Sequence, residues 1–377
     1  MLSVVFTIFT IAGCQPNEDG GTNKSSGQNP GQGKPPSSDM PDIPATEFIK
    51  NIKTGWNLGN TLDVRAKGLT AETGWGNPRT TPGMIQVIAD AGFDSVRVPV
   101  SWEKHMGEAP DYLIEEEWMD RVQEVVGYVL DTGMYCIVNT HHEDWIFPDE
   151  ANESQNTEQL IAVWKQICAR FGDYSEKLIF EGMNEPRLMN TSNEWNGGNA
   201  EAHGVVNRLN QAFVDTVRNS GGNNTLRQLI IPTYAASSEG KAMSALRIPE
   251  NDDKIIVSIH AYTPYNFALK DNGTPNWSFD SPNDTNEVDW MFNRIVENFT
   301  SKGIPVILGE TGAVNRNGNL QARVEWAEYY FGKAKELGIP CYWWDNGLTS
   351  GGGELFGLLN RREERFEFPE IVESIMK

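Results

Sequence analysis

Eight short apolar runs of strand length alternate with stretches of helical periodicity along most of this 377-residue chain. The runs expected to form strands are residues 55–60, 95–100, 134–140, 178–184, 228–233, 254–260, 305–310 and 341–344. Helices are expected at residues 82–91, 115–132, 155–171, 200–220, 289–302 and 320–337. Buried strands that alternate with helices indicate a parallel sheet, and eight of them can close into a barrel. The sequence therefore predicts an α/β fold, the (β/α)8 or TIM barrel, formed by a single domain.

A doubly wound open sheet is the alternative arrangement of the same elements. Its first strand is expected to lead into a glycine-rich phosphate loop with the spacing G-x-G-x-x-G. Residues 55–60 read GWNLGN and lack that spacing. The closed barrel is therefore preferred, and in it the carboxyl ends of all the strands share one rim.

Polar and aromatic residues occur at the end of every predicted strand. They are Asn60, Asp63, Arg97, His141, His142, Asn184, Glu185, Tyr234, His260, Tyr262, Glu310, Trp343, Trp344, Asp345 and Asn346. An isolated Asn-Glu-Pro after a strand is more often a turn than a site. Polar groups after all eight strands are too numerous for chance turns, so we expect a functional site at this rim.

Two of these residues, Glu185 and Glu310, are glutamates that the barrel would bring together. Hydrolysis of a glycosidic bond needs such a pair, one protonated to assist the leaving oxygen and one ionised to attack or stabilise the sugar. Each charge raises the pKa of the other group, which helps to divide these roles. Arg97 would hold one carboxylate ionised, although a buried structural ion pair is the commoner fate of such an arginine. The amide of Asn184 is suited to bind a sugar 2-hydroxyl.

The histidines at the rim allow two interpretations. His141 and His260 could orient the carboxylates, while Tyr262 positions the attacking one. Alternatively, residues 141–144 (HHED) and His260 could bind a metal ion. Neither HxH nor HExxH occurs, and two adjacent histidines on a strand would point to opposite faces, so no metal and no cofactor are expected.

The chain is rich in aromatic residues, with twelve Trp and ten Tyr, and aromatic faces suit sugar rings. Most of these side chains are expected in the core. Of the adjacent Trp343 and Trp344, strand alternation sends one toward the barrel interior, and we predict that Trp343 is the one that stacks on substrate. Trp145, Trp195 and Trp277 lie in loops and are further candidate stacking platforms.

The net charge narrows the class of partner, and the spacing of the cysteines bears on zinc binding. The net charge of −21 disfavours nucleic acid and anionic membrane surfaces as partners, and a neutral ligand fits better. Cysteines occur at positions 14, 136, 168 and 341, without CxxC and without zinc-ligand spacing. Cys136, Cys168 and Cys341 lie within apolar patterns and are expected to be buried free thiols.

The amino-terminal residues have a different composition. Residues 1–14 contain an apolar segment followed by Ala-Gly-Cys, which resembles a bacterial lipoprotein signal with Cys14 as the lipidated residue, although a basic start is missing. Residues 15–44 are rich in Gly, Pro, Ser and Asn and predict a flexible linker, so the folded domain is expected at 45–377. We expect export, as a cell-envelope or cell-surface lipoprotein or else as a secreted protein, with any membrane contact through Cys14 alone.

Seven motifs, taken together and in order, resemble glycoside hydrolase family 5, the cellulase family, and its subfamily 4 most of all. They are residues 55–63 (GWNLGNTLD), 95–102 (SVRVPVSW), 139–142 (NTHH), 182–186 (GMNEP), 258–262 (SIHAY), 307–312 (ILGETG) and 342–347 (YWWDNG). The resemblance covers roughly residues 46–375. It implies a retaining (β/α)8 enzyme with Glu185 as acid/base and Glu310 as nucleophile. Arg97, His141, Asn184, His260, Tyr262 and Trp343 match the other active-site positions of the family, with Asn60, His142, Tyr234, Trp344 and Asp345 as further candidates.

The function that this resemblance implies is an endo-β-1,4-glucanase (cellulase) acting by double displacement on cellulose-like, mixed-linkage or related β-glucans. The protein is expected to be a monomer. The same scaffold would also serve xyloglucan, xylan or mannan. A surface protein that only binds glycans is the competing class, but such a protein has no need of both carboxylates.

Overall fold

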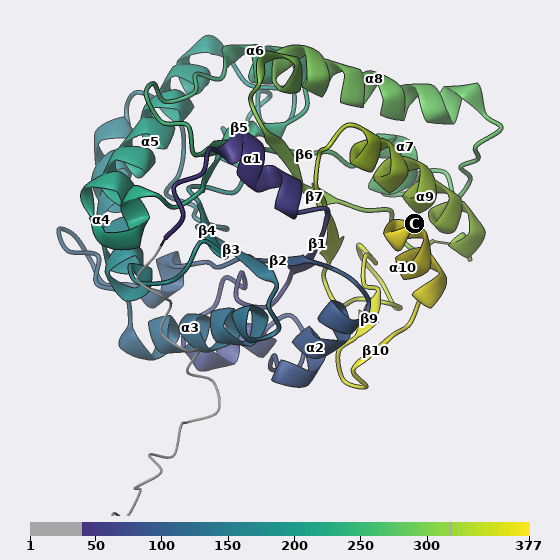
Figure 1. The fold of residues 1–377 in the computed structure, drawn as a ribbon, viewed down its shortest axis with the longest axis horizontal. Coiled ribbons are helices and arrows are strands. Elements are labelled where there is room, and N and C mark those ends of the chain that lie inside the picture. Colours follow the sequence, from purple (N-terminus) through teal and green to yellow (C-terminus); the bar gives the residue numbers. More distant parts are fainter. Residues whose placement is uncertain (1–39, 317) are drawn as a thin grey trace, which may run out of the picture. The chain divides into compact units, whose positions relative to one another are not determined.

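The computed structural model describes residues 40–316 and 318–377. The predicted leader, Cys14 and the linker as far as residue 39 lie outside the described residues. Eight parallel strands close into a barrel in the order β1 to β8, with helices around it (Figure 1), so the predicted fold is confirmed. The strands are β1 (Thr54–Leu58), β2 (Ser95–Val98), β3 (Tyr135–Asn139), β4 (Leu178–Glu181), β5 (Leu229–Ser237), β6 (Ile255–His260), β7 (Val306–Thr311) and β8 (Cys341–Asp345), and a small hairpin adds β9 (Leu359–Asn360) and β10 (Arg365–Phe366).

The helices largely follow the predicted periodicity. They are α1 (Ala45–Phe48), α2 (Pro82–Asp90), α3 (Glu116–Asp131), α4 (Glu153–Phe171), α5 (Ala200–Asn219), α6 (Gly240–Ala245), α7 (Tyr265–Ala268), α8 (Pro282–Asn298), α9 (Leu320–Glu336) and α10 (Pro369–Met376). Helix α8 begins at Pro282 and not at residue 289, where the sequence pattern placed its start. The prediction was late because the first two turns are polar and carry no apolar periodicity. Proline is favoured there, since a first-turn residue needs no hydrogen-bonded N–H.

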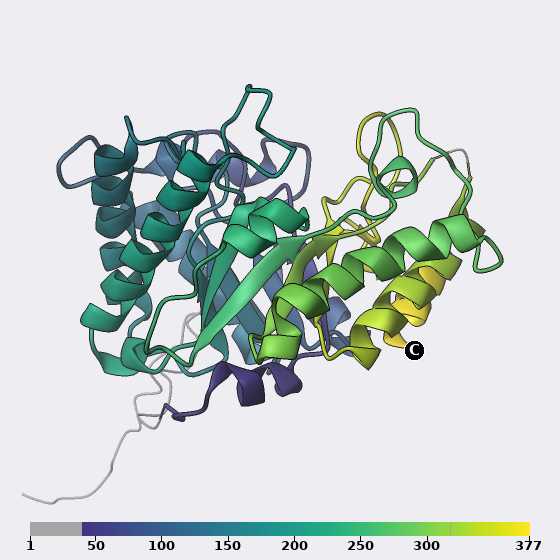
Figure 2. The same cartoon turned by 90° about the horizontal axis from the view of Figure 1, so that it is seen from above.

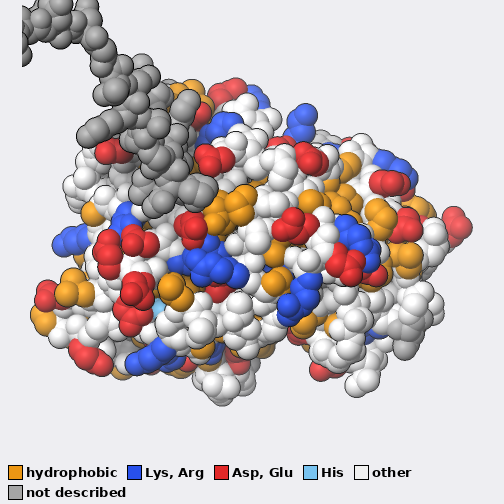
Figure 3. Space-filling view, turned by 90° about the horizontal axis from the view of Figure 1, so that it is seen from below, with side chains coloured by type: hydrophobic (Ala, Val, Ile, Leu, Met, Phe, Trp, Pro, Cys, Tyr) orange, Lys and Arg blue, Asp and Glu red, His pale blue; other side chains and the backbone are white. Residues whose placement is uncertain are grey.

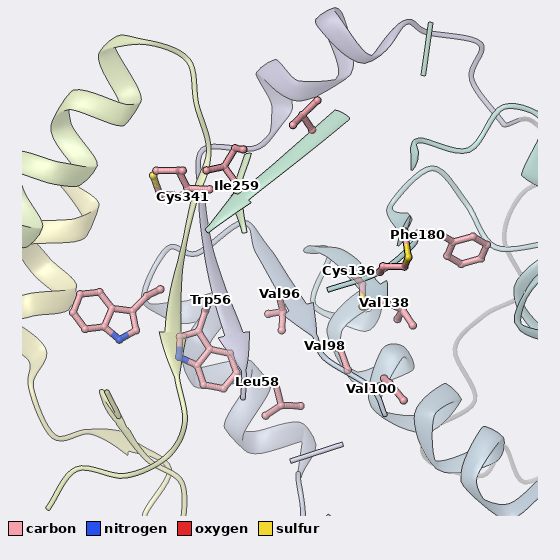
Figure 4. Packing of buried hydrophobic residues seen from close by; sticks show 14 of the residues in the cluster. Trp56, Leu58, Val96, Val98, Val100, Cys136, Val138, Phe180, Ile259 and Cys341 are labelled. Carbon is pink, nitrogen blue, oxygen red and sulfur yellow. The ribbon is translucent and has the colours of Figure 1, made fainter. Parts of the chain in front are cut away.

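Alternation along the strands separates two layers of side chains. Trp56, Val96, Val98, Cys136 and Phe180 point outward from the strands and pack in the large core between the barrel and its helices (Figure 4). The residues between them face the barrel interior. Cys136, Cys168 and Cys341 are buried free thiols, as predicted.

The lower end of the barrel interior is apolar. It is filled by Ile137, Ile179, Ile230, Ile256, Ile307 and Tyr342, together with Ala45, Phe48, Ile49 and Ile52 of the segment that contains α1. Helix α1 therefore closes the amino-terminal end of the barrel, and Figures 1 and 2 show it lying across that end.

Residues just before α1 also contact the barrel. The Gln228 side chain donates to the carbonyl of Ile43 over 2.9 Å, and the Lys254 ammonium lies 2.7 Å from an Asp42 carboxylate oxygen. The last residues of the predicted linker are thus bound to the strands' amino-terminal end.

The surface carries both signs of charge. On the face in Figure 3, acidic and basic side chains are interspersed rather than gathered in separate patches. Among residues 40–316 and 318–377, no helix combines the length and apolarity that crossing a membrane requires.

Candidate active site

A β-bulge in β7 directs Glu310 into the barrel. Ile259 pairs with Leu308 and the next residue of β6, His260, pairs with Glu310, so Gly309 is an extra residue in β7. Leu308 faces the outer core, and without the extra residue the next alternation would send Glu310 outward as well. The position needs glycine, because a Cβ on Gly309 would lie 2.6 Å from Ser258 Oγ.

Glu185 reaches the same place from the loop after β4. Asn184, its neighbour, is fixed by a backbone hydrogen bond from its N–H to the Thr140 carbonyl, 2.9 Å long. One carboxylate oxygen of Glu185 and one of Glu310 lie within 4.8 Å of each other. His260 bridges them, with its Nδ1 2.8 Å from Glu185 Oε1 and 3.6 Å from Glu310 Oε2. This close approach is in keeping with the separation of about 5–5.5 Å between the carboxyl groups of retaining glycosidases.

Arg97 of β2 is the buried cation of the site, with no exposed side-chain surface. Its Nη1 donates to Glu310 Oε1 over 2.8 Å, and its Nη2 donates to Asn184 Oδ1 over 2.7 Å. Its Nε donates to Glu181 Oε2 over 2.7 Å, and Nη1 also reaches Asn57 Oδ1 at 3.1 Å. Because the Asn184 oxygen is engaged by Arg97, the NH₂ group of Asn184 is the one that it can offer to a ligand.

Glu181 is a site residue that the sequence reasoning missed. It lies at the end of β4, is fully buried and pairs with Arg97 on the side away from Glu310. The same Oε2 accepts from Asn139 Nδ2 over 3.0 Å, and that Nδ2 lies 3.1 Å from His141 Nδ1. A charged residue within the apolar run LIFE was the signal in the sequence, because a buried carboxylate requires a buried partner.

The two catalytic candidates differ in their electrostatic surroundings and titrate as a pair. Burial raises the pKa of Glu310, and the charge of Glu185 adds to this rise against the opposing effects of His260 and Arg97. Burial also favours a higher pKa for Glu185, but His260, Arg187 and His142 together outweigh it and lower that pKa. The unliganded site therefore favours the ionised form of Glu185.

The predicted supporting residues His141 and Tyr262 both lie beside Glu310. The Tyr262 hydroxyl donates to Glu310 Oε2 over 3.0 Å, and His141 Nε2 lies 4.0 Å from Glu310 Oε1. Burial and the neighbouring cations Arg97 and Arg187 lower the pKa of His141 well below its usual value, so the ring is neutral. A neutral ring with Nδ1 facing Asn139 can donate from Nε2 toward a ligand.

The prediction for the tryptophan pair was wrong. Trp344, not Trp343, faces the barrel interior, where it stacks on His141 with ring planes 2° apart. Trp343 points outward and packs against Trp326 and Phe331 of α9. Strand alternation was the correct rule, but its phase is set by Tyr342, two residues before Trp344, which lies in the interior layer.

Three further candidates have structural roles instead. The Asp345 carboxylate accepts from Trp56 Nε1 and from backbone N–H groups of residues 347, 358 and 359, so it ties β8 to the following loop. The Tyr234 hydroxyl donates to the Asn193 carbonyl and accepts from Leu188 N–H, which fixes the loop after β4. Asn60 occupies a turn with φ of 54° that Asp63 closes through the Asn60 N–H.

His142 does lie near the site, but not as the sequence argument assumed. β3 ends at Asn139, so His141 and His142 follow the strand, and their rings lie 4.4 Å apart instead of on opposite faces. His142 lines a cavity with Glu185, and burial together with Arg65 lowers its pKa to about 3. Donor atoms of Asp63, His141 and His142 lie within 4.8 Å of one another, yet the Asp63 carboxylate already accepts from the turn N–H groups of residues 60 and 61.

The loop tryptophans differ in exposure. Trp195 is 61% exposed and Trp75, which the sequence reasoning did not single out, is 40% exposed beside His142. Trp277 is only 4% exposed and is therefore not a platform. The half-buried Trp145 donates from Nε1 to Glu143.

A closed (β/α)8 barrel with two close carboxylates at its carboxyl-terminal rim fits the class of glycoside hydrolases. The family description "Cellulase (glycosyl hydrolase family 5)" matches residues 59–350. The chain belongs to this family.

Known proteins of the family align over most of the chain. Endoglucanase A from Ruminococcus albus is 49% identical over 347 residues, which cover 90% of this chain and 94% of that protein. Cellulase/esterase CelE from Acetivibrio thermocellus is also 49% identical over 90% of this chain, but the match spans only 41% of its length. A GH5-4 broad specificity endoglucanase from Ruminococcus champanellensis, solved with bound cellotriose, superposes with a TM-score of 0.87 at 48% identity, covering 90% of this chain and 99% of the other.

Proposed function

We propose that this protein is a retaining endo-β-1,4-glucanase that cleaves internal bonds of β-glucans by double displacement. The observation that carries the proposal is that one oxygen each of Glu185 and Glu310 lie within 4.8 Å, and that Arg97 and Tyr262 hydrogen-bond to Glu310 but not to Glu185. The endoglucanases with which the chain shares almost half its residues support the choice of reaction.

In the first step, Glu310 attacks the anomeric carbon while Glu185 gives its proton to the glycosidic oxygen as that bond breaks. Arg97 and Tyr262 hold the attacking carboxylate in place through hydrogen bonds to its two oxygens. In the second step, the ionised Glu185 removes a proton from water, and the water oxygen displaces Glu310 from the sugar.

Three other side chains assist the sugar in this scheme. The NH₂ group of Asn184 is placed to bind the 2-hydroxyl, a contact that strengthens as the oxocarbenium-like charge develops. Trp344 and His141 form a stacked wall beside Glu310, where the apolar face of a sugar ring can pack.

The stereochemistry of the product tests the proposal. We expect ¹H NMR of a soluble β-glucan digest to detect the β-anomer first, with the α-anomer appearing only by later mutarotation. Initial release of the α-anomer would show that water attacks directly and would rule out Glu310 as nucleophile.

The range of polysaccharides is part of the proposal as well. Cellulose-like and mixed-linkage glucans are the proposed substrates, and xyloglucan is the second candidate; the exposed rings of Trp75 and Trp195 at the rim are suited to pack against sugar rings. Side-by-side assays on carboxymethylcellulose, lichenan, xyloglucan, xylan and mannan test it, and activity confined to xylan or mannan would contradict it.

We also propose that the protein is exported and anchored through Cys14, and that it acts as a monomer. The apolar segment before Ala12-Gly13-Cys14 and the linker composition of residues 15–39 support export. Mass spectrometry of the natural amino terminus should find a lipidated Cys14, whereas an unprocessed Met1 would contradict the proposal. Light scattering of the purified protein should give the mass of one chain.

A further inference from the structure

Arg187, two residues after the proposed acid/base, contacts that residue in two ways. Its Nη1 lies 3.5 Å from Glu185 Oε2 and donates to the Glu185 main-chain carbonyl over 3.1 Å. The other carboxylate oxygen, Oε1, is the one that faces His260. Glu185 is therefore held between a histidine on one side and a guanidinium on the other.

The guanidinium of Arg187 is itself fixed from the far side. Its Nε donates to Glu194 Oε1 over 3.1 Å, and its Cζ lies 4.4 Å above the ring of Trp195. Glu194 Oε2 in turn accepts from the Asn190 N–H over 2.8 Å. An arginine with both its edge and its face occupied loses little further freedom when it holds a carboxylate.

We propose that Arg187 is a positioning residue that holds the Glu185 carboxyl in place and sets the pH at which this group carries its proton. The inference rests on the proposed acid/base role of Glu185. Arg187 touches no reacting atom of the sugar in this scheme, so it acts only through Glu185.

Other charged groups also face Glu185. His260 approaches from β6, Glu310 from β7 and His142 from the loop after β3, and Glu354 acts from the loop after β8 on Glu310 as well as on Glu185. His260 also contacts Glu310, so its replacement would disturb both carboxylates. Arg187 is the contact that can be removed while Glu310 keeps Arg97 and Tyr262.

The direction of the effect follows from the charge. A nearby cation stabilises the ionised carboxylate, and Arg187 is among the groups that lower the pKa of Glu185. Attack on a glucan requires Glu185 protonated, so the alkaline limb of the kcat/KM profile reports the loss of the last proton from the Glu185–Glu310 pair. Without Arg187, the pKa of Glu185 should be higher, so its carboxyl group keeps its proton to a higher pH. The second step needs the ionised form, so deglycosylation should slow at acid pH.

The experiment compares pH profiles of three variants on lichenan. For Arg187→Gln we expect the alkaline limb to rise by about one pH unit. Arg187→Lys keeps a positive charge and should restore most of the wild-type position. Arg65→Gln is the matched control, because Arg65 lines the same cavity but pairs with Asp144 at 2.7 Å, and its limb should stay in place.

A second substrate separates a change in proton transfer from a general loss of structure. The dinitrophenolate of 2,4-dinitrophenyl β-cellobioside leaves without a proton, so its glycosylation rate should not follow the alkaline limb in any variant. If Arg187→Gln fails to fold, Trp195→Ala gives the test, since it removes the platform but keeps the charge and should shift the limb upward by a smaller amount.

An alkaline limb that stays in place in Arg187→Gln, with or without a lower rate at all pH values, overturns the inference. So does an equal shift in Arg65→Gln. Glu185→Gln distinguishes this from failure of the proposed function: it should lose lichenan hydrolysis while still releasing a burst of dinitrophenolate. Wild-type lichenan hydrolysis by Glu185→Gln would refute the acid/base role itself.

Discussion

The lower and upper ends of the barrel interior are built by the same strands from opposite kinds of side chain. At the lower end, one residue each from six strands meets the segment that contains α1, and the only polar pair described among them is the hydrogen bond of 2.8 Å between the Ser95 and Tyr342 hydroxyls. At the upper end, Arg97, Glu181 and Glu310 face inward, with Glu181 two residues after Ile179 and Glu310 three residues after Ile307 along their strands. The lower end supplies stability that does not depend on substrate, and the upper end keeps buried charges that stability alone would not select.

The buried charges around Arg97 at the upper end do not cancel. Arg97 is one cation between two carboxylates, and burial raises the pKa of Glu310 despite that contact. Substitutions that compare the two ends should therefore separate turnover from stability, with effects on turnover that shrink from the rim toward α1.

Replacing Glu310 should give the largest effect. For Glu310→Ala we expect kcat on lichenan to fall on the order of 10⁵-fold, because the attacking group is gone. Circular dichroism should show an intact fold. Added azide should recover part of the rate by occupying the space that the side chain leaves. Activity within tenfold of wild type would mean that the upper end does not carry the chemistry.

Glu181→Gln should come next. It keeps the shape of the side chain but removes one of the two negative charges on Arg97, so the guanidinium should bind Glu310 more strongly and make it a weaker nucleophile. We expect kcat to fall about 10–100-fold, by analogy with the loss seen when a residue that orients a metal ligand is changed. Unchanged kcat would show that Glu181 is only a structural partner, and Glu176→Gln, outside the barrel interior, is the matched control.

Trp343 and Trp344 are adjacent in β8 and face the outer core and the barrel interior, respectively. Replacing each of them therefore compares the two layers at the same level of the barrel. Trp344→Ala should raise KM for lichenan about tenfold through the lost stacking surface. Trp343→Phe should leave KM within about twofold but lower the melting temperature, since its ring fills the packing against α9. Steady-state kinetics and thermal melting on both variants give the comparison, and a reversed pattern would contradict the assignment of faces.

A change at the lower end should affect turnover least. Ile256→Ala removes buried methyl groups next to the α1 plug and should cost about 2–5 kcal/mol in the free energy of unfolding. Urea denaturation measures that loss, and kcat at a temperature where the variant is folded should stay within about twofold. A drop in kcat comparable to that of Glu181→Gln would show that the two ends are coupled.

The sequence was sufficient to predict the barrel because the same pattern, an apolar run followed by polar residues, occurs eight times. Apolar runs and their polar ends located each strand and most rim residues, and alternation showed that only one of Trp343 and Trp344 could face inward. Which one depends on the phase of β8, and only Tyr342 packed against the interior layer fixes it. Glu181 was missed because a polar residue inside a strand gives no turn signal, and the α1 plug was missed because four residues carry too little periodicity.

The extra residue at Gly309 has a consequence for transferring this chemistry to another scaffold. A glutamate grafted onto an ideal strand at the corresponding site would enter the wrong layer, whatever its neighbours, because the insertion rather than the amino acid decides which way it turns. Protein engineers who copy such a centre should therefore carry over the local irregularity of the backbone first and the functional group second.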